Sequence, residues 1–262
     1  MKITIIGAGS WGSALGKIAS DNGHAVIMYD KSREIVSEIN EFHTNKSKLP
    51  VGSLSEEVRA TTDLEEAVAF GDILLLAVPT AVIREVLKEI KDVIKSAKLF
   101  VNASKGLEPG TFKGVSEIVA EEIAPEHVRA FVALSGPSHA EEVILGMLTL
   151  IAAASPDLEA ARLVQRVFSN QTYFRVYTLT DLKGVEICAS LKNIIALASG
   201  IIAGLGYGDN TRAALITRGL VEIRRIACSL GAEERTVFGL AGLGDLVVTC
   251  TSTHSRNFQA GY

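Results

Sequence analysis

The chain has 262 residues, a formal net charge of −4 at pH 7 and a hydrophobic content of 48%. These values are typical of a globular protein with a sizeable core, and the length favours two domains. The negative charge gives no general attraction to nucleic acid or to an anionic membrane, so neither is expected as a partner. A small anionic ligand would need a local cluster of cationic side chains.

The first residues and the cysteines indicate the compartment. The apolar run after Met1 is short and reaches Gly7 at once, so no signal peptide is expected, and no apolar stretch is expected to reach the ~18 residues of a transmembrane helix. Cys188, Cys228 and Cys250 are widely spaced, without a metal or redox pairing. We therefore expect a cytoplasmic protein with no metal site.

Short apolar runs alternate with helical patterns through the first two thirds of the chain. This alternation favours an α/β fold, a doubly wound parallel sheet with helices on both faces. The directions of the last few strands are left open. The expected strands are Ile3–Ile6, Ala25–Tyr29, Val58–Thr61, Ile73–Val78, Leu99–Asn102, Ala130–Leu134, Leu148–Ala154 and Phe174–Tyr177, and the expected helices include Gly12–Asp21, Ala81–Ile94, Gly114–Ile123 and Leu158–Phe168.

A glycine-rich motif lies between the first strand and the first helix. Gly7, Gly9 and Gly12 form the pattern G-x-G-x-x-G, and Asp30 follows the second strand. In a Rossmann domain the first glycine permits a tight turn, the second lets the backbone approach a pyrophosphate, and the third lets the helix pack on the sheet. The free N–H groups of the helix N-terminus then face the phosphates. The motif predicts a dinucleotide-binding βαβ unit.

The residues after the second strand leave the choice of nicotinamide cofactor open. The Asp30 carboxylate can accept hydrogen bonds from the adenosine ribose, which favours NAD. The neighbouring Lys31 and Arg33 can instead hold the 2′-phosphate of NADP. The expected cofactor is therefore NAD(P).

After Thr180 the pattern becomes helical. Asp181 is a plausible N-cap, and a second helix is expected to enter near Asn210 or Thr211. We expect residues 1–180 to form the NAD(P)-binding Rossmann domain and residues 181–262 an all-helical substrate and catalytic domain. The last residues, 255–262, read as the start of another element, so a helical domain shortened at its C-terminus is expected.

Three segments carry side chains suited to hydride-transfer chemistry, which needs a proton acceptor and charge complementarity to the substrate. Lys105 follows a buried strand and precedes a glycine. Residues 135–138, Ser-Gly-Pro-Ser, follow another strand, and the second hydroxyl also suits a helix N-cap. Lys192 interrupts an apolar helix, so it either extends to solvent or faces a cleft.

Taken together, these motifs indicate a resemblance to a known protein family. The sequence resembles the NAD(P)-dependent glycerol-3-phosphate dehydrogenases of the bacterial type, and the resemblance covers essentially the whole chain in order. It rests on residues 7–12 (GAGSWG), 104–106 (SKG), 135–138 (SGPS), 191–193 (LKN), 206–211 (GYGDNT), 239–246 (GLAGLGDL) and 255–257 (SRN).

The resemblance implies a reaction. Glycerol 3-phosphate and NAD(P)+ would interconvert with dihydroxyacetone phosphate and NAD(P)H, supplying glycerol 3-phosphate for phospholipid synthesis. Lys192 would be the proton acceptor on the substrate alcohol, a role that a partly desolvated amine with a lowered pKa can fill. Lys105 would polarise the carbonyl oxygen, and Asp245 would orient the hydrogen bonds of the lysine.

The resemblance also implies the binding residues. The substrate would contact Lys105, Gly136, Ser138, Lys192, Asp245, Ser255, Arg256 and Asn257, the last three at its phosphate, and Arg256 suits this anion because its planar guanidinium can donate two hydrogen bonds. The cofactor would contact Gly7, Gly9, Ser10, Trp11, Gly12, Asp30, Lys31, Lys105, Ala140 and Arg256. A homodimer is one option for the assembly.

Two other interpretations stay open at this point. A similar two-domain reductase could act on another hydroxy acid or an imine, in which case Arg256 would not serve a phosphate. Alternatively, a shortened chain could be an inactive nucleotide-binding module, which would bind a dinucleotide without turnover.

Overall fold

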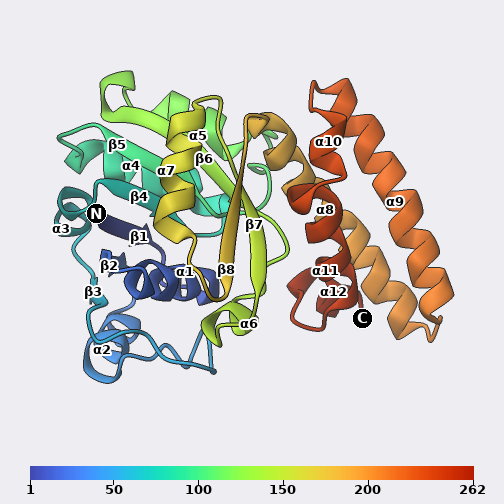
Figure 1. Ribbon diagram of the computed structural model, residues 1–262, viewed down its shortest axis with the longest axis horizontal. Coiled ribbons are helices and arrows are strands. Elements are labelled where there is room, and N and C mark those ends of the chain that lie inside the picture. Colours follow the sequence, from blue (N-terminus) through green and yellow to red (C-terminus); the bar gives the residue numbers. More distant parts are fainter.

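The structure, a computed structural model, describes all 262 residues. Eight strands form one sheet in the order β3-β2-β1-β4-β5-β6-β7-β8 (Figure 1). All neighbouring strands are parallel except β6 and β7, which are antiparallel. The predicted doubly wound sheet is therefore confirmed, and the strand directions that the sequence left open are now known. The strands are β1 (Lys2–Ile6), β2 (Ala25–Tyr29), β3 (Arg59–Thr61), β4 (Ile73–Leu76), β5 (Lys98–Asn102), β6 (Val128–Ser135), β7 (Thr149–Ala154) and β8 (Phe174–Leu179).

Helices cover both faces of this sheet. In β1, Ile3 and Ile5 join the core on one face and Ile6 joins the core on the other, which explains why the strand is apolar throughout. One face carries α1 (Ser10–Asp21), α2 (Arg33–Phe42), α6 (Ala140–Ile144) and α7 (Leu158–Phe168), and the other carries α3 (Leu64–Phe70), α4 (Ile83–Val93) and α5 (Val115–Glu122), with single turns η1 (Thr80–Val82) and η2 (Pro125–His127).

The chain after β8 is helical, as predicted. Asp181 caps the first helix, its carboxylate accepting a hydrogen bond from the N–H of Gly184 at 2.8 Å. The second helix begins at Asp209, next to the predicted entry near Asn210 or Thr211, and Gly208 is its N-cap. The elements are α8 (Leu182–Gly204), α9 (Asp209–Ser229), α10 (Glu234–Val237), the π-helical turn η3 (Leu240–Gly244), α11 (Asp245–Thr251) and α12 (Arg256–Gly261).

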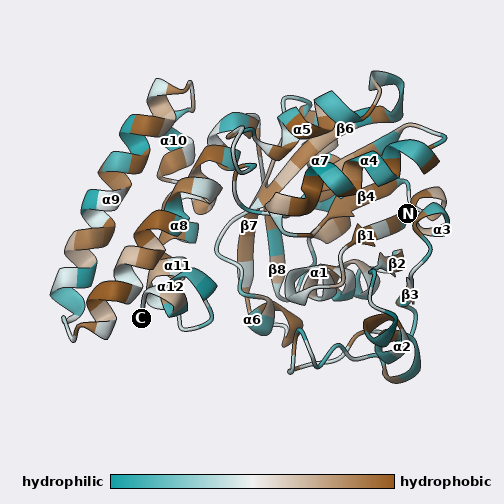
Figure 2. Cartoon of the chain, turned by 180° about the vertical axis from the view of Figure 1, so that it is seen from behind, coloured by the Kyte–Doolittle hydropathy of each residue, from teal (hydrophilic) through white to brown (hydrophobic).

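The helix α8 is long and apolar enough to cross a membrane, judged by length and composition alone. This overturns the expectation that no apolar stretch reaches such a length. The helix packs against α9, α11 and α12, and its side chains Ile187, Ile195 and Ala196 belong to the core of the helical region. Burial against neighbouring helices therefore accounts for its apolar sequence, which Figure 2 shows.

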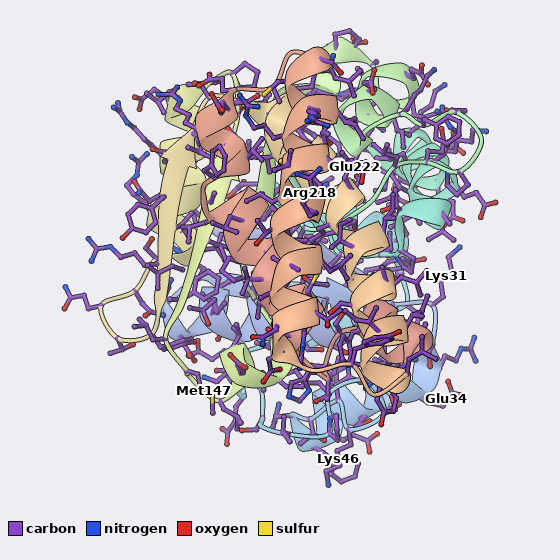
Figure 3. The ribbon with its side chains drawn as sticks, turned by 90° about the vertical axis from the view of Figure 1, so that its right-hand side faces the viewer. Lys31, Glu34, Lys46, Met147, Arg218 and Glu222 are labelled. Carbon is purple, nitrogen blue, oxygen red and sulfur yellow. The ribbon has the colours of Figure 1, made fainter.

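The helical region lies beside the half of the sheet that contains β6, β7 and β8 (Figure 1). Small side chains permit the close approach: Ala133, Ala152 and Ala154 of the sheet pack against Val185 of α8 and Ala241 of η3. The outermost helix is α9, and Figure 3 shows it from outside. As a result, the start of α8 lies beside the carboxyl ends of β5 and β6.

Candidate active site

The glycine-rich turn after β1 has the geometry of a phosphate cradle. Gly7 has φ +106°, a left-handed value that favours glycine. A Cβ on Gly12 would lie 2.1 Å from the carbonyl oxygen of Gly7, so α1 packs on the turn only because residue 12 is glycine. A Cβ on Gly9 would meet nothing within 4 Å, which leaves open space above the turn. No side chain caps α1, so its first N–H groups remain available to a ligand. These features fit the pyrophosphate of a dinucleotide.

At the end of β2, the predicted contacts Asp30 and Lys31 have partners within the chain. The Asp30 carboxylate accepts hydrogen bonds from the N–H groups of Ala8 and Ser32, both at 3.0 Å. Lys31 forms an exposed ion pair with Glu89 at 2.7 Å, which raises the pKa of Lys31. Asp30 therefore also supports the glycine-rich turn.

Three further predicted cofactor residues lie around the start of α1. The hydroxyl of Ser10 donates to the carbonyl oxygen of Lys48. The indole N–H of Trp11 is buried and has no hydrogen-bond partner. Ala140 is buried at the start of α6, which packs against α1. All three thus lie on or next to the element that carries the glycine-rich turn.

The three predicted catalytic residues meet although they are far apart in the sequence. The Lys192 amine lies 2.6 Å from Oδ1 of Asp245. The Lys105 amine lies 2.9 and 2.8 Å from Oδ1 and Oδ2 of the same carboxylate. Lys105 comes from the loop after β5, Lys192 from α8, and Asp245 from the start of α11, after the π-helical turn. Two amines and one carboxylate therefore form a cluster between the sheet and the helical region.

Burial changes the acid–base properties of this cluster. The exposed fraction of Lys192 is 4% and that of Asp245 is 1%, whereas the Lys105 side chain is 21% exposed. Burial, with the positive charge of Lys105, lowers the pKa of Lys192 to about 7, and the Asp245 carboxylate only partly opposes this shift. The Lys192 amine can therefore gain and lose a proton near neutral pH, as a general base requires.

Thr249 belongs to the same cluster and was not predicted from the sequence. Its hydroxyl accepts a hydrogen bond from the Lys192 amine at 2.8 Å and donates to the backbone carbonyl of Asp245. Because Thr249 follows Asp245 by four residues on one helix, the two side chains share a face. The spacing of four residues could have suggested that Thr249 lies near Asp245. Its contact with Lys192 follows only from the packing of α8 against α11.

The segment after β6 lines the same site. The carbonyl oxygen of Gly136 accepts hydrogen bonds from the Lys105 amine at 3.0 Å and from the Ser138 hydroxyl at 3.1 Å. Gly136 has φ +151°, and a Cβ there would lie 2.9 Å from the Cα of Ile151. The alternative role of Ser138 as a helix N-cap is wrong, because His139 occupies the N-cap of α6. Gly136 and Ser138 are therefore brought to the cluster.

The predicted phosphate-binding residues start the last helix. Ser255 is the N-cap of α12, and its hydroxyl accepts from the N–H of Phe258. Asn257 donates to Oδ1 of Asn193 on α8 at 2.9 Å. Arg256 is exposed and forms no ion pair within the chain. Asn257 thus ties this segment to the helix of Lys192, and the Arg256 guanidinium remains free to bind an anion.

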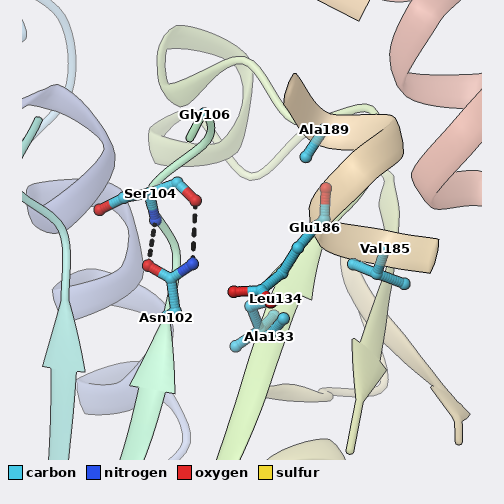
Figure 4. Close-up of a pocket in the computed structure, with 9 residues that line it drawn as sticks. Asn102, Ser104, Gly106, Ala133, Leu134, Val185, Glu186 and Ala189 are labelled. Carbon is cyan, nitrogen blue, oxygen red and sulfur yellow. Dashed lines mark hydrogen bonds between the residues drawn. The ribbon is translucent and has the colours of Figure 1, made fainter. Parts of the chain in front are cut away.

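A small cavity lies next to the cluster, and one of its lining residues is an acid that was not predicted to belong to the site, Glu186 (Figure 4). The cavity measures about 10 Å³, the room of one water molecule, between α8 and the ends of β5 and β6. The Glu186 carboxylate accepts hydrogen bonds from the N–H of Ser116 at 2.9 Å and from its hydroxyl at 2.5 Å. Burial raises the pKa of Glu186 while these hydrogen bonds oppose the shift. Glu186 joins α8 to the N-terminus of α5.

Comparisons with known proteins identify the family. Residues 2–161 match the model of the NAD-dependent glycerol-3-phosphate dehydrogenase N-terminus, and residues 181–262 match the model of the C-terminus. The chain belongs to the NAD-dependent glycerol-3-phosphate dehydrogenase family. The predicted family is therefore confirmed, and with it the class, an oxidoreductase that uses NAD(P).

Individual members of the family show the extent of the similarity. Glycerol-3-phosphate dehydrogenase [NAD(P)+] of Staphylococcus aureus strain USA300 / TCH1516 is 52% identical over 261 residues, which cover 100% of this chain and 78% of the relative. The Staphylococcus carnosus protein of the same name is 49% identical with the same coverage. The crystal structure of glycerol-3-phosphate dehydrogenase from Coxiella burnetii superposes with a TM-score of 0.93 at 37% identity, covering 99% of this chain and 78% of that one.

Proposed function

We propose that this protein interconverts sn-glycerol 3-phosphate and dihydroxyacetone phosphate, with NAD(P)+ and NAD(P)H as the second substrate pair. Family membership supports the activity of a glycerol-3-phosphate dehydrogenase [NAD(P)+]. The observation that carries the mechanism is the Lys192 amine, which is 4% exposed and lies 2.6 Å from the Asp245 carboxylate. An amine so placed is suited to accept the proton of a secondary alcohol at neutral pH.

In this proposal the sheet region and the helical region of the chain have different roles. Residues 1–180 bind the dinucleotide, and residues 181–262 supply the proton acceptor and much of the substrate site. The crevice between them is the expected position of the reacting atoms, because ligands of open α/β sheets lie at the carboxyl ends of the strands.

The cofactor site would use the cradle after β1. The pyrophosphate would lie on the N–H groups of Gly9, Ser10 and Trp11, with Gly7 and Gly12 shaping the turn. The adenosine end would lie near Asp30 and Lys31, and the nicotinamide end near Ala140, Lys105 and Arg256. When bound, the nicotinamide accepts or donates the hydride.

The protein side of the reaction is proton transfer and charge stabilisation. Neutral Lys192 accepts the hydroxyl proton of glycerol 3-phosphate during oxidation, and the resulting ammonium returns it to the oxygen during reduction. Lys105 polarises the same oxygen with its ammonium group. Asp245 holds both amines in place through the contacts of 2.6 to 2.9 Å described above.

The substrate phosphate would be held by the start of α12. Arg256 has no partner within the chain and can donate two hydrogen bonds to one phosphate. Ser255 and Asn257 flank it, while Gly136 and Ser138 lie beside Lys105 and so near the reacting carbons. We further propose a cytoplasmic enzyme, with a homodimer as one option, whose glycerol 3-phosphate feeds phospholipid synthesis.

The assay that tests this proposal compares two ketones. Oxidation of NADH and of NADPH is measured with dihydroxyacetone phosphate and with dihydroxyacetone, which lacks the phosphate. We expect turnover with the phosphorylated ketone and at least one cofactor, and a KM at least about a hundredfold higher for dihydroxyacetone. Equal KM values would indicate a different hydroxy substrate. A rise in melting temperature with a dinucleotide, without turnover on either ketone, would indicate a binding module instead.

A further inference from the structure

Residues 43–54, in the segment between α2 and β3, fold back onto the glycine-rich turn. One contact residue is Asn45, which is 4% exposed. The side-chain amide of Asn45 donates to the carbonyl oxygen of Ala8 at 2.7 Å and to the hydroxyl of Ser13 at 2.9 Å. Because the Ala8 carbonyl can only accept, the donor side of the amide must face it.

The segment is itself fixed, so Asn45 is a rigid anchor. The N–H groups of Lys48 and Leu49 donate to the backbone carbonyl of Asn45, closing a tight turn. The Glu38 carboxylate of α2 accepts hydrogen bonds from the Thr44 hydroxyl and the Lys46 N–H. A second contact with the cradle comes from the carbonyl of Lys48, which accepts from the hydroxyl of Ser10.

The Ala8 carbonyl determines where the next N–H points. In a planar trans peptide the C=O of residue 8 and the N–H of residue 9 point in opposite directions. Asn45 holds the carbonyl at 2.7 Å on the side of α1, so the Gly9 N–H is directed away from Asn45. This N–H donates no hydrogen bond within the chain, and the space above Gly9 is open. On the other side of the same residue, Asp30 holds the Ala8 N–H at 3.0 Å.

We propose that Asn45 is a positioning residue for the dinucleotide: by holding the Ala8 carbonyl it aims the Gly9 N–H at the pyrophosphate. This inference rests on the proposed dinucleotide site and not on the identity of the second substrate. Without the Asn45 amide, the peptide between Ala8 and Gly9 can rotate, and the cofactor must order it on binding.

The test measures NADH binding directly, by fluorescence titration of the purified chain, together with the KM values of both substrates. Asn45→Ala removes the amide, and Asn45→Asp keeps its size but replaces the donor with an acceptor. Both should raise the Kd and KM for NADH about tenfold or more, while kcat at saturating NADH and the KM for dihydroxyacetone phosphate change by less than about threefold.

Asn40→Ala is the matched control. Like Asn45, Asn40 donates from its side-chain amide to a backbone carbonyl, that of Ala60, and it also accepts from the Ala60 N–H, but it does not touch the glycine-rich turn. It should lower the melting temperature and leave the Kd for NADH within about twofold, as expected for a purely structural amide.

The outcomes separate the inference from the proposed function. Wild-type affinity for NADH in both Asn45 variants would overturn the positioning role, whatever the turnover. A raised Kd in these variants, in a protein that does not reduce dihydroxyacetone phosphate, would support the positioning role and overturn the proposed substrate. Equal loss of affinity in Asn40→Ala would also overturn the inference, and a wild-type chain that binds no dinucleotide would overturn both.

Discussion

The amine of Lys192 lies 2.6 Å from Oδ1 of Asp245, and both side chains are almost completely buried. The same carboxylate holds Lys105, so one negative charge serves two amines. Burial and the neighbouring positive charge therefore disfavour a proton on Lys192, and its pKa falls to about 7. Proton transfer by Lys192 near neutral pH depends on this arrangement of three charges.

The pH dependence of turnover should follow the protonation of Lys192. Oxidation of glycerol 3-phosphate needs the neutral amine, so kcat/KM should rise as pH increases through about 7, the pKa of Lys192. Reduction of dihydroxyacetone phosphate needs the ammonium, so its kcat/KM should fall above the same pH. Measurement of both profiles in one buffer series checks this, and limbs of the same direction would contradict it.

Stability should depend on pH for the same reason. The pKa of Lys192 is about 7 in the folded chain and 10.5 as the ordinary value, so between these values the unfolded chain binds more protons. The free energy of unfolding should therefore rise with pH in this window, by up to about 1.4 kcal/mol per unit from this group. Lys192→Met should remove this contribution in urea titrations at several pH values. An unchanged pH dependence in the variant would contradict the assignment.

Removal of the Asp245 carboxylate should shift the pH profile of glycerol 3-phosphate oxidation to lower pH. In Asp245→Asn the charge that favours protonated Lys192 is lost, so its pKa should fall below the wild-type value and the rising limb of the oxidation profile should move to lower pH. The maximal kcat should also fall by about a hundredfold, because both amines lose their anchor. Asp209→Asn is the control, since Asp209 is exposed and pairs with Arg212 on α9. A pH profile like that of the wild type would be evidence against the cluster.

Arg256 should act on the substrate phosphate. Arg256→Ala should raise the KM for dihydroxyacetone phosphate by about a hundredfold, the loss of a charge-assisted double hydrogen bond, and leave the melting temperature unchanged because the side chain is exposed. Arg218→Ala is a suitable control, as Arg218 lies exposed on the outer helix α9 (Figure 3). Equal KM values for dihydroxyacetone phosphate in the two variants would show that Arg256 does not bind the substrate phosphate.

Two glycines of one motif should respond differently to the same substitution. Gly12→Ala places a Cβ 2.1 Å from the Gly7 carbonyl, so the variant should lose stability and dinucleotide binding together. Gly9→Ala meets nothing within 4 Å, so the variant should fold with an unchanged melting temperature but bind NADH at least about tenfold more weakly. Thermal melts and NADH titrations of both variants check the contrast. Normal NADH affinity in Gly9→Ala would show that the pyrophosphate lies elsewhere.

Much of the sheet could be predicted because its strands are apolar on both faces and separated by helical periodicity. Four helices of this region were named from the sequence as examples, and α2, α3 and α6 were not among those named. The prediction that no apolar stretch reaches membrane-spanning length failed at α8, because Glu186 and Lys192 interrupt the sequence of a helix that is nevertheless apolar on average.

The geometry of the glycine-rich turn was predictable, because its glycines belong to a local motif. The role of a residue was not predictable where its partner lies in a distant segment of the chain. Thr249 contacts Lys192 across 57 residues, and Asn45 contacts Ala8 across 37 residues. Both are ordinary polar residues in the sequence, and only the packing of α11 on α8 and of the 43–54 segment on α1 gives them partners.

The turnover of Lys192→Met tests most directly whether the Lys192 amine moves the proton. Methionine fills a similar volume without an amine, so the buried site should stay packed and NADH should bind with wild-type affinity. We expect kcat for dihydroxyacetone phosphate reduction to fall by about a thousandfold, with an unchanged Kd for NADH. A variant that binds NADH normally and keeps its kcat within about tenfold of wild type would show that another group moves the proton.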